Sequence, residues 1–256
     1  MMHGLSSALC TAAVLLTFAV FAGCSIKERR ENCPCIVIVT CDEPVHMRLD
    51  CPQAGLLIEE ELPRGLPVRF EMPRLQFFYT FFSDCGAFFD GQGCYIPPGS
   101  ESPPLRLMCG SAFAAGESVS LPVELRKSYC VLSLDVHSIA EPSTSPLPSV
   151  TVSGNVCGWE WSGALRKGPF RVEKVPEDGK CTICVPRQDD DSLLLSLELG
   201  GVRRTFALGE LLASDGYDWS APDLGDVSLY VDCALTIMEL TISRFPESVQ
   251  EEITVF

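Results

Sequence analysis

The sequence is short of histidine, of positive charge and of long apolar segments, and each shortage removes a class of function. It contains three histidines, and its 19 Lys and Arg stand against 34 Asp and Glu, for a formal net charge of −15. Nucleic acids require a basic protein surface, and anionic lipid headgroups attract the same positive charge. We therefore expect no nucleic-acid partner and no electrostatic docking on lipid headgroups.

Catalytic patterns are scarce as well. After His3, only His46 and His137 could serve as a histidine base, and we expect both to be bystanders, with His46 in a polar loop. No Gly-rich phosphate loop is present in the sequence. The acidic run at 189–191 lacks the alternating oxygen ligands of a calcium loop and fits a solvated hairpin better. The sequence predicts no enzyme, no metal site, no cofactor and no evident small-molecule substrate.

The one uncharged apolar run lies at the N-terminus. As a helix rising ~1.5 Å per residue, residues 12–23 would span only ~18 Å of a ~30 Å hydrocarbon core. A short apolar run that ends in small residues is typical of an export signal. Ala22-Gly23-Cys24 resembles the lipobox of bacterial lipoproteins, in which cleavage falls between Gly23 and Cys24 and the cysteine is acylated. The alternative is an ordinary secretory signal in which Cys24 is incidental.

Lipidation at Cys24 would explain the charged run that follows it. Residues 1–23 would then be a lipoprotein signal peptide, and residues 24–32, with the charged run 27–31, would form a lipidated tether. Several acyl chains are sufficient for stable membrane anchoring. We expect a chain that is attached to a membrane through N-terminal lipid and otherwise faces water.

From residue 33 onward the chain alternates apolar and polar residues, the pattern of half-buried β-strands. The clearest rows lie at 35–41, 130–136, 193–199 and 229–237. Further strands are predicted at 56–61, 68–72, 76–82, 105–108, 150–156, 171–174 and 203–208, with one short helix near 210–214. Many short strands separated by Pro, Gly, Asp and Ser are typical of antiparallel β-sandwiches. The sequence predicts an all-β fold.

Two segments could link domains. The first, 110–120, is small and polar, and the second, 140–149, is rich in Pro and Ser. We prefer a break at the first segment, because the second fits a long loop after the first strand of a second domain. This choice predicts an N-terminal β-sandwich domain at 33–117 and a C-terminal β-sandwich domain at 118–256.

Cysteine is abundant, and twelve cysteines remain after Cys10 and Cys24. An even number in an exported chain favours some disulfides, with Cys85 and Cys94 the best candidate pair because a bridge would close a Gly-rich turn. Cysteines on the apolar strand rows are expected to act as small hydrophobes. A redox site at Cys181 and Cys184 would need a helix N-terminus to lower a thiol pKa, whereas the flanking residues predict a turn and a strand.

The opening segment resembles a known family. The sequence "CSIKERRENCPCIVIV", from Cys24 to Val39, is similar to the N-terminus of the FimB and Mfa-type fimbrial anchor lipoproteins of Bacteroidota. There a lipobox cysteine precedes a short charged segment, a Cys-Pro motif and the first strand, which correspond here to Cys24, 27–31, Cys33-Pro34-Cys35 and 36–40. The segments 116–136 and 226–242 resemble the entry to the family's second domain and its closing strands. The family's closing Trp is replaced by Arg244-Phe245, and the cysteine count is high for the family.

The resemblance implies two tandem transthyretin-like antiparallel β-sandwich domains, lipid-anchored to the cell outer membrane and exposed at the surface. It further implies an anchor or minor subunit of a fimbrium that engages fimbrial (pilin) subunits by β-strand addition, in which main-chain hydrogen bonds and alternate side-chain pockets hold the added strand.

Two other functions remain open from the sequence. One is a stand-alone surface lipoprotein that binds glycan or a host protein through the loop at 92–104 or through Trp159 and Trp161. The other is an exported thiol oxidoreductase that uses Cys181 and Cys184.

Overall fold

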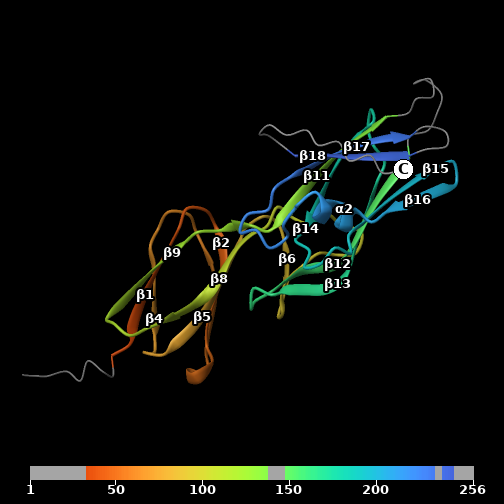
Figure 1. Cartoon of the computed structure of the whole chain (residues 1–256). Helices are drawn as coiled ribbons and strands as arrows, with labels where there is room; N and C mark the ends of the chain where they lie inside the picture. Colours follow the sequence, from red (N-terminus) through yellow and green to blue (C-terminus); the bar gives the residue numbers. More distant parts are fainter. Residues whose placement is uncertain (1–32, 138–147, 234–237, 245–256) are drawn as a thin grey trace, which may run out of the picture.

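The computed structural model describes residues 33–137, 148–233 and 238–244, and within them nearly every element is a strand (Figure 1). The strands of the first half are β1 (Cys35–Cys41), β2 (Val45–Cys51), β3 (Leu56–Leu62), β4 (Val68–Met72), β5 (Gln76–Ser83), β6 (Phe88–Asp90), β7 (Gly93–Tyr95), β8 (Arg106–Phe113), β9 (Ser118–Val123) and β10 (Arg126–Lys127). Those of the second half are β11 (Tyr129–His137), β12 (Ser149–Glu160), β13 (Leu165–Lys174), β14 (Lys180–Pro186), β15 (Leu194–Leu199), β16 (Val202–Phe206), β17 (Val227–Cys233) and β18 (Met238–Arg244). One 3-10 turn, η2 (Pro52–Ala54), and one α-helix, α2 (Leu208–Ser214), complete the described elements. The predicted all-β fold and the predicted short helix are confirmed.

The first sandwich is made of two sheets. A three-stranded sheet in the order β4-β1-β9 packs on a five-stranded sheet in the order β10-β8-β5-β2-β3. In β1, Cys35, Val37 and Val39 point inward and are fully buried, as period-2 alternation requires. Phe77 and Phe81 of β5 fill the same core from the opposite sheet. The predicted entry of the first strand at Cys35 is confirmed.

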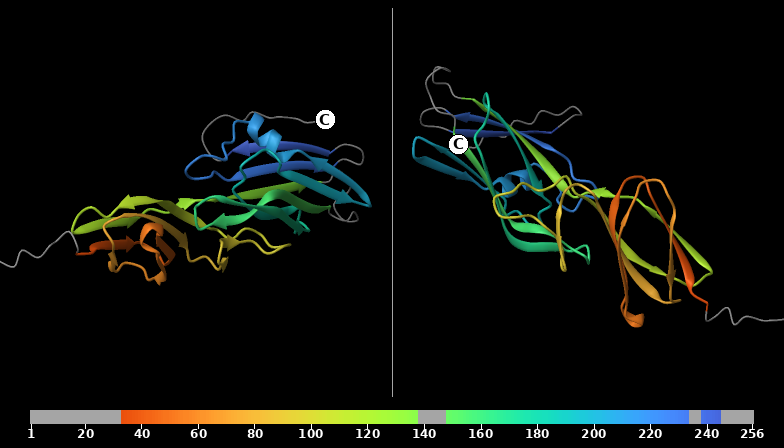
Figure 2. Two further views of the ribbon diagram at one scale, coloured as in Figure 1. Left: turned by 90° about the horizontal axis from the view of Figure 1, so that it is seen from below. Right: turned by 180° about the vertical axis from the view of Figure 1, so that it is seen from behind.

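The second sandwich has the same two-layer form. A four-stranded sheet, β14-β11-β17-β18, packs on a six-stranded sheet, β16-β15-β12-β7-β6, and β13 pairs with β12. The two sandwiches follow one another along an elongated molecule, with β1 at one end and the β15–β16 hairpin at the other (Figure 2). Tandem β-sandwiches are therefore confirmed.

The two sandwiches exchange segments along the chain. Strand β9, which follows residue 117, pairs with β1 in the first sandwich. Conversely, residues that precede β9 contribute to the second sandwich: β7 pairs with β12, and Phe82, Cys94 and Leu105 belong to the second core. A boundary at residue 117 stays a prediction, and the pairing of β9 with β1 argues for a break a few residues later.

Candidate functional site

The outer edge of β8 is the first component of the site. Hydrogen-bonded pairs alternate along an antiparallel ladder. At one end of the β5–β8 ladder, the backbone N–H of Ala114 donates to the carbonyl of Leu75. The main-chain groups of the even-numbered residues of β8 therefore bond to β5. Cys109, Ser111 and Phe113 therefore direct their backbone N–H and C=O groups away from β5. Within the described residues, the only strand on this outer side is β10, which pairs at Arg106 and Leu107.

Strand β9 provides a second edge, in the opposite sheet. Ile36 donates to the carbonyl of Glu117, so the odd-numbered residues of β9 face its partner β1. Ser118, Ser120 and Pro122 then face outward, and Pro122 has no N–H to donate. The sandwich is thus open on one side, between the edge of β8 and the edge of β9.

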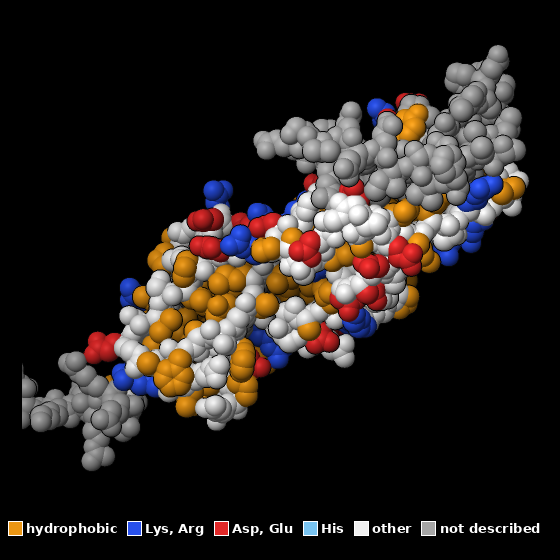
Figure 3. Space-filling view, viewed as in Figure 1, with side chains coloured by type: hydrophobic (Ala, Val, Ile, Leu, Met, Phe, Trp, Pro, Cys, Tyr) orange, Lys and Arg blue, Asp and Glu red, His pale blue; other side chains and the backbone are white. Residues whose placement is uncertain are grey.

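The space between these two edges is apolar. Met108, Val119 and Leu121 turn toward the first core from the two strands, and Tyr79 lies beside them. Gly110 makes room for the Tyr79 ring, since a Cβ there would lie 2.5 Å from the Tyr79 hydroxyl oxygen. The space-filling view shows hydrophobic side chains gathered in a hollow on this half of the molecule (Figure 3). We call this space, bounded by β8, β9, Tyr79 and Leu121, the lateral slot.

Two cavities adjoin β8. At the end of the lateral slot, a groove of about 690 Å³ is lined by Tyr79, Met108, Leu121, Trp159 and Arg187 among others. A hollow of about 620 Å³ lies on the outer face of the five-stranded sheet, lined by residues that include Arg48, Asp50, Phe78, Ser111 and Trp161. Cavities on both faces of a free strand edge are suited to the alternating side chains of an added strand.

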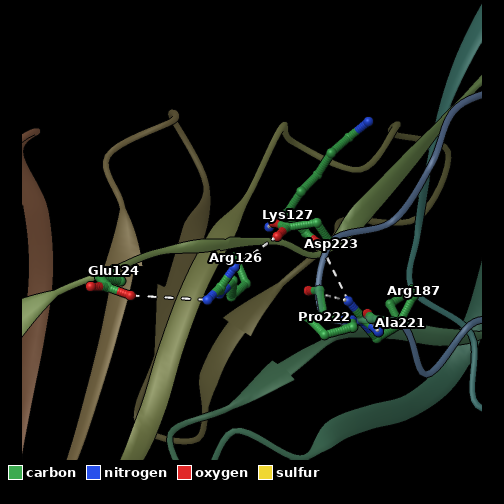
Figure 4. A network of polar contacts seen from close by, with 7 residues as sticks. All are labelled: Glu124, Arg126, Lys127, Arg187, Ala221, Pro222 and Asp223. Carbon is green, nitrogen blue, oxygen red and sulfur yellow. Dashed lines mark hydrogen bonds and ion pairs between the residues drawn. The ribbon is translucent and has the colours of Figure 1, made fainter.

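A polar network fixes the junction of the two sandwiches at the closed end of the lateral slot (Figure 4). The guanidinium of Arg187 donates to the carbonyls of Ala221 (2.7 Å), Lys127 and Pro222 (3.2 Å each). Arg126 joins Asp223 at 3.1 Å and approaches Glu124 at 3.9 Å.

The carboxylate of Asp223 completes this network. It accepts the Lys127 backbone N–H at 2.7 Å, and this bond, together with the Arg126 guanidinium, holds the pKa of Asp223 below its usual range. The strand segment 126–128 is thereby tied to the loop 217–224, and the slot has a rigid end.

The two predicted glycan-stacking tryptophans are occupied within the protein. Trp159 is fully buried, and its indole N–H donates to Ser128 Oγ at 2.9 Å. Trp161 is partly buried, with Phe89 stacked on it at 5.8 Å and the Arg48 guanidinium 5.6 Å from its ring centroid. Trp159 offers no face to a sugar ring, and the ring of Trp161 already contacts Phe89 and Arg48.

The turn that carries Trp161 also contacts β8. Thr80 Oγ1 donates to the Trp161 carbonyl, and Gly163 packs against the Cys109 side chain, where a Cβ would lie 2.2 Å from Sγ. Gly163 has a φ of +82°, so glycine is required there on both grounds. This contact sets the second sandwich against the outer face of β8 at Cys109 and leaves Ser111 and Phe113 exposed.

Cys181 and Cys184 lie in strand β14 and not at a helix N-terminus. Burial raises the pKa of the Cys181 thiol to about 11, and burial also raises the pKa of the Cys184 thiol. Nucleophilic thiols need a lowered pKa, so the geometry gives no support to a redox site.

The candidate pair Cys85 and Cys94 consists of free thiols in the structure, like the other cysteines whose side chains are described. Burial and then the neighbouring Cys85 raise the pKa of Cys94 to about 12. A bridge between them stays a prediction. Cys51 and Cys94 are fully buried strand residues, and each fills a core position.

Other predicted positions are placed as follows. The expectation that His46 lies in a loop is wrong: it sits in β2, 4.4 Å from the Phe89 ring, with Nδ1 3.4 Å from Glu61. Asp189 pairs with Lys167, and Asp190 accepts from Asn155 at 2.7 Å. Among the described residues no cluster of His, Cys, Asp and Glu could hold a metal ion, and no helix has the length and hydropathy to span a bilayer.

The proposed cleavage site at Gly23 and Cys24 lies outside the described residues. The sequence could not place the lateral slot, because strand neighbours and register decide which edges stay open. The absence of charge between Met108 and Phe113 was the one available signal.

Comparison with known proteins relates this fold to bacterial surface proteins. No protein-family model and no curated protein sequence matches the chain. Among solved structures, the fimbrial anchor protein Mfa2 from Porphyromonas gingivalis is similar with a TM-score of 0.57 and 11% identity, over 83% of this chain and 98% of that one. A candidate adhesin from Bacteroides ovatus is similar with a TM-score of 0.60 and 11% identity, over 91% of this chain and 98% of that one. A candidate polysaccharide-binding protein from Bacteroides thetaiotaomicron is similar with a TM-score of 0.60 and 10% identity, over 83% of this chain and 99% of that one.

The fold is thus an all-β tandem sandwich of the kind found in the Mfa-type fimbrial anchor and in candidate adhesins of Bacteroidales. The resemblance carried by the opening segment is confirmed at the level of the fold. At these identities the likeness concerns the fold alone.

Proposed function

We propose that this chain is a surface-exposed lipoprotein of the outer membrane that acts as anchor or minor subunit of a fimbrium. Its N-terminal lipid at Cys24 attaches it to the membrane, and residues 25–32 serve as the spacer. The elongated tandem sandwich begins at one end with β1, the strand next to that tether, and so extends away from the membrane.

The binding mode that we propose is β-strand addition to a pilin subunit. The observation that carries it is the lateral slot, where two unpaired strand edges flank apolar side chains. An added strand would satisfy the main-chain groups at the edge and cover the apolar row. Fold likeness to the Mfa2 anchor supports the same reading.

A C-terminally tagged copy, extracted from host outer membranes in mild detergent and run without boiling, tests this function. A ladder of large species that dissociate on heating and contain a second β-sandwich subunit is expected. A lipidated monomer with no pilin would contradict the anchor role and leave a stand-alone adhesin as the better account.

Glycan binding through Trp159 and Trp161 is less well supported, since both indoles are engaged by the protein itself. A thiol oxidoreductase is disfavoured by the raised pKa values of Cys181 and Cys184. The similar solved structures are described as candidate adhesins, a fimbrial anchor and a candidate polysaccharide-binding protein.

A further inference from the structure

We infer that the partner strand pairs with the outer edge of β8, at Cys109–Phe113, in line with β10. This inference rests on the strand addition proposed above and specifies which edge accepts the strand. Strand β8 carries the five-stranded sheet on its other side, so an added strand extends a sheet that is already formed.

The other strand edges of the described chain carry features that oppose pairing. Charged side chains, proline and covering groups are the devices by which proteins protect such edges. Three glutamates lie on β3, Arg69 and Glu71 lie on β4 between Pro67 and Pro73, Pro169 lies in β13, and Arg203 and Arg204 lie on β16.

Strand β14 is protected differently, by side chains from other segments. Glu101 accepts the Cys184 backbone N–H at 3.0 Å, Ser102 donates its N–H to the Cys184 carbonyl at 3.0 Å, and Lys174 donates to the Thr182 carbonyl at 2.5 Å. The outward main-chain groups of Cys184 and the carbonyl of Thr182 are therefore already bonded. Strand β6 has only three residues.

Strand β8 has none of these protections between Met108 and Phe113. This segment, MCGSAF, contains no charge and no proline. The backbone N–H groups of Cys109, Ser111 and Phe113 face outward, and the Phe113 side chain is 60% exposed. The facing edge of β9 ends in Pro122, which cannot donate. An uncharged, unpaired edge is where another strand is expected to add.

The two faces of β8 specify the chemistry of the partner strand. Inward side chains of an added strand would enter the lateral slot beside Tyr79, Met108 and Leu121. Outward side chains would lie beside Phe78 and Ser111, in the hollow that also holds Asp50 and Arg48. The partner is therefore an extended segment with large apolar residues at alternate positions and polar, hydrogen-bonding residues between them.

Ser111→Pro tests the accepting edge, because it removes one outward N–H of β8 without removing a bond to β5. Ser111→Ala keeps the N–H and is the matched control, while Ser120→Pro makes the equivalent change on β9. Ser111→Lys is a second variant that keeps the backbone and adds a charge to the edge. Each replaces the chromosomal copy in the host, with the host's own surface fibres as the probe and the unboiled ladder as the readout.

Ser111→Pro and Ser111→Lys should each reduce the ladder at least about tenfold, as expected for a loss of ~1.4 kcal/mol or more, whereas Ser111→Ala and Ser120→Pro should keep it. Thermal unfolding of the purified variants shows whether each chain remains folded. If Ser111→Pro does not fold, the ladder of Ser111→Lys tests the accepting edge instead. If only Ser120→Pro abolished the ladder, the choice of β8 would be overturned and strand addition would remain supported. An unchanged ladder in all four would contradict strand addition itself.

Discussion

Arg187 Nη1 lies 2.7 Å from the carbonyl oxygen of Ala221, so the residue directly after β14 of the second sandwich holds the loop that closes the lateral slot. The same guanidinium donates to the carbonyl of Lys127, in β10 of the first sandwich, at 3.2 Å. One side chain thus joins the loop 217–224 to the segment between β9 and β11. The geometry of the slot depends on this junction as well as on the sheets.

Replacing Arg187 by Met should therefore destabilise the protein. Several partly buried carbonyls would lose their donor, and a hydrogen bond to a charged group contributes about 1.5–3 kcal/mol net of its exchange with water. We expect a loss of about 2–4 kcal/mol in the free energy of unfolding, measured by urea denaturation. Arg171→Met is the control, since Arg171 is exposed and lies 3.6 Å from Glu173. A loss no larger than that of the control would contradict the junction.

The two tryptophans should differ in their effect on stability. Trp159 is fully buried with its N–H bonded, so Trp159→Ala should cost about 3–5 kcal/mol. Trp161 is only partly buried, and Trp161→Ala should cost clearly less. Equal losses in chemical denaturation would show that Trp161 is as deeply packed as Trp159. Saturable binding of a soluble glycan that Trp161→Ala abolishes would favour the glycan-binding alternative.

The thiols of β14 should react slowly at neutral pH. The pKa of Cys181 is raised from 9.0 to about 11, so at pH 8 only about one thiol in a thousand is a thiolate. Alkylation of Cys181 by iodoacetamide, followed by peptide mass spectrometry, should accelerate with pH until about pH 11. The exposed Cys33 is the accessible reference. Rapid labelling of Cys181 at pH 7 would reopen the redox reading.

The same raised pKa has a consequence for stability. Between pH 9 and 11 the unfolded chain loses this proton while the folded chain keeps it, so the free energy of unfolding should fall as pH rises through that window. Urea denaturation of wild type and Cys181→Ala at pH 8 and pH 10.5 measures the effect. The alanine variant should lose less stability between the two values, and equal losses would exclude Cys181 as a contributor.

Cys24→Ala should release the protein from the membrane. Without the thiol no acyl chain can be attached, and the acidic chain has no other membrane signal that we identify. We expect the variant, and any fibres that it holds, in the culture medium, with no incorporation of a clickable palmitate analogue. Ser25→Ala, next to the lipobox, should remain in the membrane fraction. Retention of Cys24→Ala in the membrane would point to a different attachment.

Much of the fold could be predicted from residue periodicity. Alternation identified β1, β11, β15 and β17, because each has one buried face. The short strands β6, β7 and β10 were missed, since two or three residues carry no period. Strand β2 was also missed, although Val45, Met47, Leu49 and Cys51 alternate with polar residues and are buried on one face, so the sequence did carry the signal of this strand.

The site itself could not be predicted in the same way. Whether Ser111 faces a neighbouring strand or open space depends on the order β10-β8-β5, and local sequence does not specify that order. The interleaving of β7 with the second sandwich has the same origin, since its partner β12 lies more than sixty residues away. Long-range pairing decided both features, and neither leaves a periodic trace.

Amide hydrogen exchange of β8 tests the central claim most directly. Exchange into residues 106–113 is compared, by mass spectrometry, between the isolated protein and the protein within its heat-dissociable assembly, with 118–123 as the internal comparison. The account predicts strong protection of 106–113 in the assembly and little change in 118–123. Unchanged exchange in 106–113 would contradict strand addition at β8.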